Sequence, residues 1–351
     1  MLNITFYGIL LFMSTGESPL SQPNAAVVRE PFPAIEEGYL PDNVLVHFHF
    51  APHIYGYHFE GAQQLLEAAD AYIPEARGWD HGVLKEFNDL AKRKIELSKY
   101  LGHGRRDSGY SEAQSRAIEG TRKPIVFIDG SLQELGPSEL SVGLASPDET
   151  LEDTIDKISE VAKRTALESV RRDPIMIGNL GDKVWTLYKK NRDWVEREQI
   201  NILCTLGQSH IAVYDYLSQQ EGSRENVAAS MWVGGNDITE TYKVMDYFKR
   251  GEVPPRRLLV ESVVMELLGL PQTQHFLEQA ITVNVSPRHG QGLTEVESFS
   301  QRLVDLIADD IDDSPRLQKS MQSFLNGDIR PGYIALLRQY VERAKEASTT
   351  P

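Results

Sequence analysis

The alternation of apolar and polar positions predicts that ordered structure begins at residue 43 with a buried strand. The first 42 residues are rich in Pro, Ser, Gly and Glu and show no apolar periodicity, so we expect a flexible leader over 1–42. Residues 44–50 read Val-Leu-Val-His-Phe-His-Phe, which is typical of a strand inside a sheet. A helical pattern at 58–69 and a second short strand at 71–73 complete a predicted βαβ unit.

Helices and strands are expected to keep alternating up to residue 225. The further segments with helical spacing or continuous apolar runs are a helix at 82–100, a strand at 124–128, helices at 148–170 and 174–192, and a strand at 200–206. Strands separated by helices are typical of a mainly parallel sheet flanked by helices. We therefore predict an α/β core over residues 43–225.

The remainder of the chain, residues 226–351, has helical patterning almost throughout. Its expected helices are near 238–250, 256–269, 271–283, 295–312 and 332–346. We find no internal repeat among them, and we expect a C-terminal helical subdomain or cap.

Net charge and cysteine content limit the classes of binding partner and the cellular compartment that we expect. Among 351 residues, 51 Asp and Glu outnumber 36 Lys and Arg, which gives a formal net charge of -15. Such a chain repels a phosphate backbone or an anionic membrane, so we expect no nucleic acid and no membrane as partners. The single cysteine, Cys204, lies in an apolar run and is expected in the core. One cysteine cannot form an intramolecular disulfide, which fits a reducing compartment and favours a cytoplasmic protein.

Histidines gather around the first predicted strand. Four of the nine, namely His47, His49, His53 and His58, fall within twelve residues. In a strand, His47 and His49 project from the same face, and neutral imidazoles placed in this way can hold a transition metal together with His53 from the following loop. The alternative is that each histidine is hydrogen-bonded beneath a covering helix.

Three further residues lie where chemistry is expected in such a fold. His210 ends a Gly-Gln-Ser-His sequence directly after the strand at 200–206, and the carboxyl ends of parallel strands are where ligands bind. Glu75 follows the short second strand and is suited to bind a metal or act as a general base. Arg172, at an expected helix junction, is suited to hold a carboxylate or an oxyanion. A solvated loop glutamate and a solvated helix-end arginine are the ordinary alternatives for Glu75 and Arg172.

In their order along the chain, these segments resemble the superfamily of TraB/PrgY-like, TIKI-type, ChaN-like and erythromycin-esterase-like proteins. The resemblance covers residues 43–220 and is carried by Phe-Ala-Pro-His at 50–53, the strand leading to Glu75, Arg-Asp at 172–173, and Gly-Gln-Ser-His at 207–210. It implies hydrolysis of a peptide or ester bond in a small-molecule or peptide substrate, and this hydrolysis depends on a divalent metal ion. In this interpretation His53, His210 and His49 bind the metal, and Glu75 and Arg172 carry the chemistry.

A non-catalytic protein that binds a small ligand or haem on the same fold is the competing interpretation. Phe50 stands where the family's first histidine loop has glycine, and this departure favours a binding role. Serine chemistry at Ser209 or Ser131 has no G-x-S-x-G sequence to support it. Nucleotide binding lacks both a P-loop and a G-x-G-x-x-G sequence after a strand.

Overall fold

The computed structural model describes residues 31–51, 59–102, 109–136, 150–231, 239–269, 302–311, 313–319 and 331–349. These residues form two compact units. The first, which we call the sheet unit, contains the described residues up to 136 together with 168–231. The second, the helical unit, contains residues 150–167 and the described residues from 239 onward.

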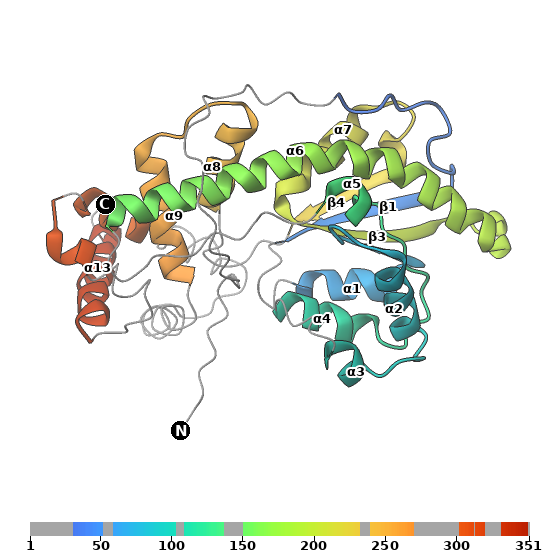
Figure 1. Ribbon diagram of the computed structural model, residues 1–351, viewed down its shortest axis with the longest axis horizontal. Coiled ribbons are helices and arrows are strands. Elements are labelled where there is room, and N and C mark those ends of the chain that lie inside the picture. The colour runs from blue at the N-terminus through green and yellow to red at the C-terminus, as the bar shows by residue number, and fades with distance from the viewer. Residues whose placement is uncertain are drawn as a thin grey trace. The chain divides into compact units, whose positions relative to one another are not determined.

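The sheet unit is built on four parallel strands, which confirms the predicted α/β class (Figure 1). The strands are β1 (Val44–Phe50), β2 (Ala71–Pro74), β3 (Ile200–Leu206) and β4 (Val227–Met231), in the spatial order β2-β3-β1-β4. The register places Val46 between Ile202 and Val227. We expected the core to end at residue 225, but β4 pairs with β1 and extends the sheet to Met231.

Side-chain alternation gives the sheet two different faces. Phe48 and Phe50 of β1 project with Cys204 of β3 into a core that includes Met176 and Leu180 of α6 (Leu151–Lys190). This core also receives apolar residues of α7 (Ile211–Gln219), and it contains Cys204 as predicted.

The opposite face carries His47 and His49 and is covered by a second group of helices. These are α1 (Glu60–Ala68), α2 (His81–Ala91), α3 (Leu97–Gly102) and α4 (Gly109–Ile118). In Figure 1 they lie on the side of the sheet away from α6. Their apolar residues pack with Tyr72 and Leu203 in a separate core. The sheet is therefore flanked by helices on both faces.

The long helix α6 corrects the prediction of two helices at 148–170 and 174–192. It runs without a break through Pro174, although proline removes one backbone hydrogen bond and crowds the preceding turn. Fully buried apolar residues after the proline, Met176, Ile177, Leu180 and Val184, continue its buried stripe. Tertiary packing of this stripe outweighs the local cost of proline. Arg172 therefore lies inside a helix and not at a helix junction.

Two other predicted elements are shorter than expected. The helix at 82–100 is divided, because α2 ends at Ala91 and Arg93 adopts a left-handed conformation with φ of 53°. The segment 124–128 forms only an isolated bridge between Ile125 and Tyr72, rather than a full strand. Pro124 has no N–H to donate, which limits this segment as a strand.

The described part of the expected leader belongs to the sheet unit and packs into its core. Leu40 is buried in the core beneath α6, and the Tyr39 hydroxyl donates a hydrogen bond to the carbonyl oxygen of Ile177. Residues 31–42 thus contribute to the fold, and residues 1–30 lie outside the described residues.

The helical unit confirms that helices dominate the C-terminal part of the chain. It contains α8 (Thr239–Lys249), α9 (Arg256–Gly269), α13 (Pro331–Thr349), helical residues 302–310 and 315–319, and the first turns of α6. Val263, Leu303, Ile311 and Val341 belong to its main apolar core. The helix expected at 271–283 lies outside the described residues.

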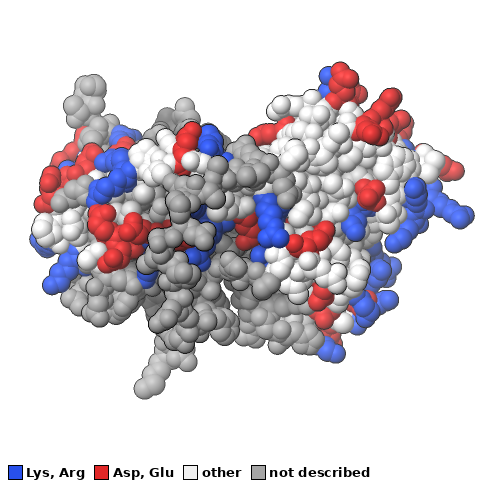
Figure 2. Space-filling model, turned by 45° about the horizontal axis from the view of Figure 1, so that its top comes forward, with Lys and Arg blue, Asp and Glu red and all other residues white. Residues whose placement is uncertain are grey.

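Two properties concern both units. Within the described residues, no helix is both long enough and apolar enough to cross a membrane. On the face shown in Figure 2, acidic and basic side chains are interspersed over the described surface.

Candidate functional site

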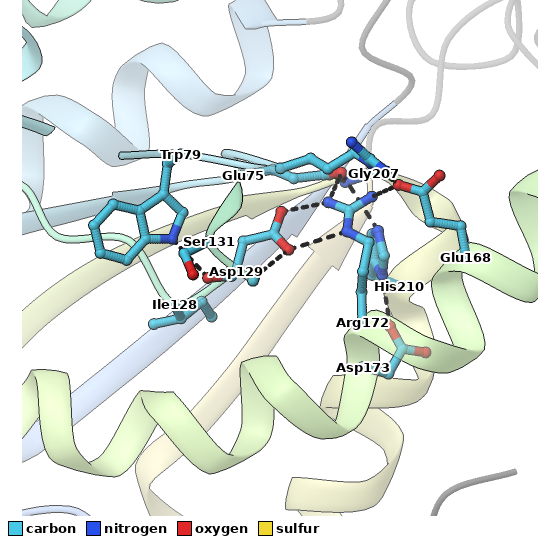
Figure 3. Close-up of polar contacts among 12 residues, drawn as sticks. Glu75, Trp79, Ile128, Asp129, Ser131, Glu168, Arg172, Asp173, Gly207 and His210 are labelled. Atoms are coloured by element: carbon cyan, nitrogen blue, oxygen red, sulfur yellow. Dashed lines mark hydrogen bonds and ion pairs between the residues drawn. The ribbon is translucent and has the colours of Figure 1, made fainter. Parts of the chain in front are cut away.

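Charged side chains from four segments meet at the carboxyl end of the sheet (Figure 3). Glu75 follows β2, Asp129 follows the segment 124–128, and His210 ends a short 3-10 helix that directly follows β3. Arg172 and Asp173 come from α6. We call these five residues the Arg172–His210 cluster.

Glu75 is fixed by the backbone at the end of β3. Its own N–H donates to the carbonyl oxygen of Thr205 at 2.9 Å, so the backbone pairing of β2 and β3 continues one residue further. Its carboxylate Oε2 accepts a hydrogen bond from the N–H of Gly207 at 2.6 Å. A Cβ at position 207 would lie 3.1 Å from this oxygen, so glycine allows the close approach.

Arg172 is held between two carboxylates. Its Nη2 donates to Oε1 of Glu75 at 2.6 Å, and its Nε donates to Oδ1 of Asp129 at 3.0 Å. Nη2 also contacts Oδ2 of Asp129, which completes a bidentate pair. The Arg172 side chain is 8% exposed and that of Asp129 is 0% exposed. Burial lowers the pKa of Arg172, but the two carboxylates outweigh burial and raise it above its ordinary value.

His210 is fully buried, and each of its ring nitrogens faces a carboxylate. Nδ1 lies 2.5 Å from Oδ1 of Asp173, and Nε2 lies 3.3 Å from Oε1 of Glu75. Burial and the charge of Arg172 lower the pKa of His210. The charge of Glu75 and the hydrogen bond and charge of Asp173 outweigh them and raise the pKa to about 9. In the absence of a bound metal ion, the His210 ring is therefore a protonated imidazolium at neutral pH.

A second layer of ionic contacts surrounds Arg172. Its Nη1 lies 3.8 Å from Oε1 of Glu168, one turn earlier on α6, and Glu168 also pairs with Arg77. The indole N–H of Trp79 donates to the carbonyl oxygen of Asp129 at 2.7 Å. These contacts hold the backbone and side chains of the cluster in place.

The facing atoms of His210 and Glu75 would fit a metal ion in part. Nε2 of His210 is buried and has no hydrogen-bond partner among the described residues. Its distance of 3.3 Å from the Glu75 oxygen is close to the about 3.4 Å that separates two ligands of one tetrahedral zinc ion. Within the described ranges, however, no group of three His, Cys, Asp or Glu residues is arranged to hold a metal. The described part of the chain thus offers two donor atoms, and a third would have to come from outside it.

The predicted site residues have different outcomes. Glu75, Arg172 and His210 lie together, as the sequence led us to expect. His49 does not join them, because it projects from the opposite face of the sheet and its Nδ1 lies 2.9 Å from the Ser230 hydroxyl. His53 lies outside the described residues.

The sequence interpretation missed Asp129 and Asp173 as members of the site. Asp129 follows an apolar run that leads towards the same edge as Glu75, and Asp173 adjoins Arg172. A buried guanidinium requires a carboxylate partner, and a buried imidazole requires a hydrogen-bond partner. Acidic residues beside Arg172 and at the same sheet edge are the signal that could have identified Asp173 and Asp129.

Comparison of the chain with family models, curated proteins and solved structures finds no match. The resemblance described from the short sequence motifs therefore stays a prediction.

Proposed function

We propose that this chain is a metal-dependent hydrolase of peptide or ester bonds and that the Arg172–His210 cluster belongs to its active site. One observation carries the proposal: Nε2 of the buried His210 faces Oε1 of Glu75 at 3.3 Å, while Asp173 occupies the other ring nitrogen. Two electron-pair donors that face each other in this way need a proton or a metal cation between them.

Asp173 supports the metal-binding form of His210. When Nδ1–H donates to the carboxylate of Asp173, Nε2 keeps its lone pair and is directed towards Glu75. Metal-binding histidines commonly donate their second ring N–H to a carboxylate or carbonyl oxygen. Asp173 would thus fix both the tautomer and the orientation of the ring.

The sequence supplies a candidate for the missing donor. His53 comes three residues after β1, and β1 pairs with β3, which leads to His210. We propose His53 and His210 as metal ligands. A bound divalent ion would polarise the scissile carbonyl and lower the pKa of water. Glu75, whose Oε1 would contact the ion beside Nε2 of His210, is also the proposed acceptor of the water's proton.

Arg172 is assigned a role different from the one we expected. We expected it to hold a charge on the substrate, but its guanidinium already contacts Glu75 and Asp129. We propose that Arg172 keeps Glu75 ionised and orients it through the bond from Nη2 to Oε1. Asp129 fixes the guanidinium in turn.

Metal content measured on matched histidine variants tests the proposal. We expect wild-type protein equilibrated with zinc, manganese or cobalt to retain an equimolar amount of one of these metals after gel filtration. His210→Ala should lose it, whereas His81→Ala, which removes an exposed histidine of α2, should retain it. Chelation should then abolish hydrolysis of a panel of peptides and esters by the wild type. Equal metal content in wild type and His210→Ala would contradict the proposal.

A non-catalytic role in ligand or haem binding is favoured by one observation. The side chains of His210, Arg172 and Glu75 are only 0%, 8% and 14% exposed, so they present little surface to a substrate. In that case the purified protein should show a Soret band with added haem, or retain metal without hydrolysing any substrate of the panel. Either result, with no turnover, would replace the hydrolase by a binding protein.

A further inference from the structure

A second polar cluster lies on the face of the sheet opposite to the Arg172–His210 cluster. The Ser230 hydroxyl of β4 is 2.8 Å from Nε2 of His47 and 2.9 Å from Nδ1 of His49. The strands β1 and β4 are neighbours (Figure 1). Their register pairs His49 with Ser230. Ser230 is the penultimate residue of β4, so the cluster lies near the carboxyl end of the sheet.

The hydrogen-bonding of Ser230 is constrained because a hydroxyl carries a single proton. If the hydroxyl donates to one imidazole, the other imidazole must donate its N–H to the hydroxyl oxygen. The serine is thus placed between a proton acceptor and a proton donor.

Burial decides which histidine accepts the proton. His49 is 3% exposed, so a positive charge on its ring would be costly. His47 is partly exposed, and its remaining ring nitrogen can be solvated when the ring is charged. Burial lowers the pKa of His47, which keeps the ring neutral and able to accept a proton at neutral pH. His47 is therefore the acceptor, and His49 is the donor that orients the hydroxyl.

The ordinary interpretation of these contacts is cross-strand hydrogen bonding between polar residues. Such cross-strand bonding explains a contact between one histidine and Ser230. It does not explain why two imidazoles, those of His47 and His49, are directed at the same hydroxyl. A hydroxyl next to a base, with a further group that fixes its orientation, is the arrangement found in activated nucleophiles.

We propose that Ser230 is a nucleophile that accepts an acyl group from esters, with His47 as its general base and His49 as a positioning residue. Ser230 Oγ forms a bond to the carbonyl carbon of the ester, and its proton passes to Nε2 of His47. The bond between that carbon and the leaving alcohol's oxygen breaks, and His47 returns the proton to this oxygen. The products are an acylated Ser230 and a free alcohol, and water can later release the acid and restore the hydroxyl.

The position of Ser230 allows a small ester to approach. β4 lies at the edge of the sheet formed by the described residues, Ser230 is partly exposed, and the adjacent Met231 is 44% exposed. The cluster shares no residue with the metal-dependent site proposed above, and the two project from opposite faces of the sheet. The proposal therefore does not depend on a metal.

Covalent labelling of the full-length protein tests the proposal. In metal-free buffer with a chelator, a fluorophosphonate should react with the serine oxygen and release fluoride, which adds one phosphonyl group per chain to the intact mass. Peptide mapping of the wild-type adduct should place the group on Ser230. An adduct on another residue, or no adduct at all, would overturn the proposal. Because this test uses the wild-type protein, it does not depend on whether any variant folds.

Matched variants test the individual roles. Ser230→Ala should abolish the adduct, while Ser218→Ala, which removes another partly exposed serine whose hydroxyl donates to the carbonyl of Asp215, should not. His47→Gln should slow labelling by about 100-fold or more, the usual size of a general-base effect. His81→Gln, which changes an exposed histidine of α2, should label at the wild-type rate. Labelling of His47→Gln at the wild-type rate would remove His47 as the base.

Discussion

At the scale of single residues, the charge of His210 depends on its neighbours more than on its burial. Glu75 and Asp173 together raise its pKa from an ordinary value of 6.5 to about 9, although burial and Arg172 oppose them. The folded protein thus binds a proton at His210 more tightly than the unfolded chain does. The stability gained in this way is fully present below pH 6.5, and it is lost as the pH rises through about 9.

This linkage predicts a pH-dependent difference between wild type and His210→Gln. In chelator, the wild type should have the larger free energy of unfolding at pH 6, and the advantage should decline by roughly 3 kcal/mol between pH 6 and pH 10. Urea titrations across this range measure the difference, with His81→Gln as the control at an exposed position. An advantage that grows with pH would show that His210 is neutral in the folded protein.

The sequence indicated some of these residues and not others for a physical reason. Apolar patterning predicts where β2 and β3 end. The sequence therefore allowed us to predict that Glu75 and His210, which follow these strands, lie at the same edge of the sheet. The face from which a strand residue projects can also be predicted, and His47 and His49 do share a face. Which face then meets α6 depends on tertiary packing, and for this reason His49 was assigned to the wrong set of partners.

At the scale of elements, α6 supplies the two residues that neutralise and orient the cluster. Arg172 and Asp173 project into the sheet unit, whereas the neighbouring Arg171 is exposed and contacts only backbone carbonyls, at Glu134 and Leu135, in the described structure. Pro174 suggested a helix end at this point, and the continuous helix could not be predicted because its buried stripe is formed with residues far along the chain.

The two adjacent arginines provide a matched test of this arrangement. Arg172→Met should lower the free energy of unfolding by about 3–5 kcal/mol, because Glu75 and Asp129 would be left buried without a counter-charge. Arg171→Met should cost less than about 1 kcal/mol, as expected for an exposed arginine. Urea denaturation monitored by circular dichroism measures both, and comparable losses for the two variants would contradict a neutralising role for Arg172.

At the scale of the whole molecule, each unit has an apolar core of its own. Ile202 is fully buried in the sheet unit, and Ile311 is fully buried in the helical unit. The division into an α/β part and a helical part was visible in the sequence. The sequence did not show that residues 150–167 belong to the helical unit, because helical periodicity does not say which partner a helix face will contact.

Separate cores predict that the units respond separately to core mutations. Ile202→Ala and Ile311→Ala should each destabilise their own unit by about 2–5 kcal/mol. In calorimetry of the full chain, we expect two transitions, one lowered by each substitution. A single transition that both substitutions lower equally would show that the units unfold together.

The division of α6 between the two units also has a consequence for synthesis of the protein on the ribosome. Ile155, Ile158, Ala162 and Ala166 are made long before the described residues of α8, α9, 302–311 and α13 that bury them. The sheet unit, in contrast, can close as soon as β4 has emerged. Nascent chains therefore pass through an interval in which the N-terminal turns of a 40-residue helix display an uncovered apolar stripe, the kind of surface that chaperones bind. Slow translation beyond residue 231 would lengthen this interval and raise the yield of aggregated chain.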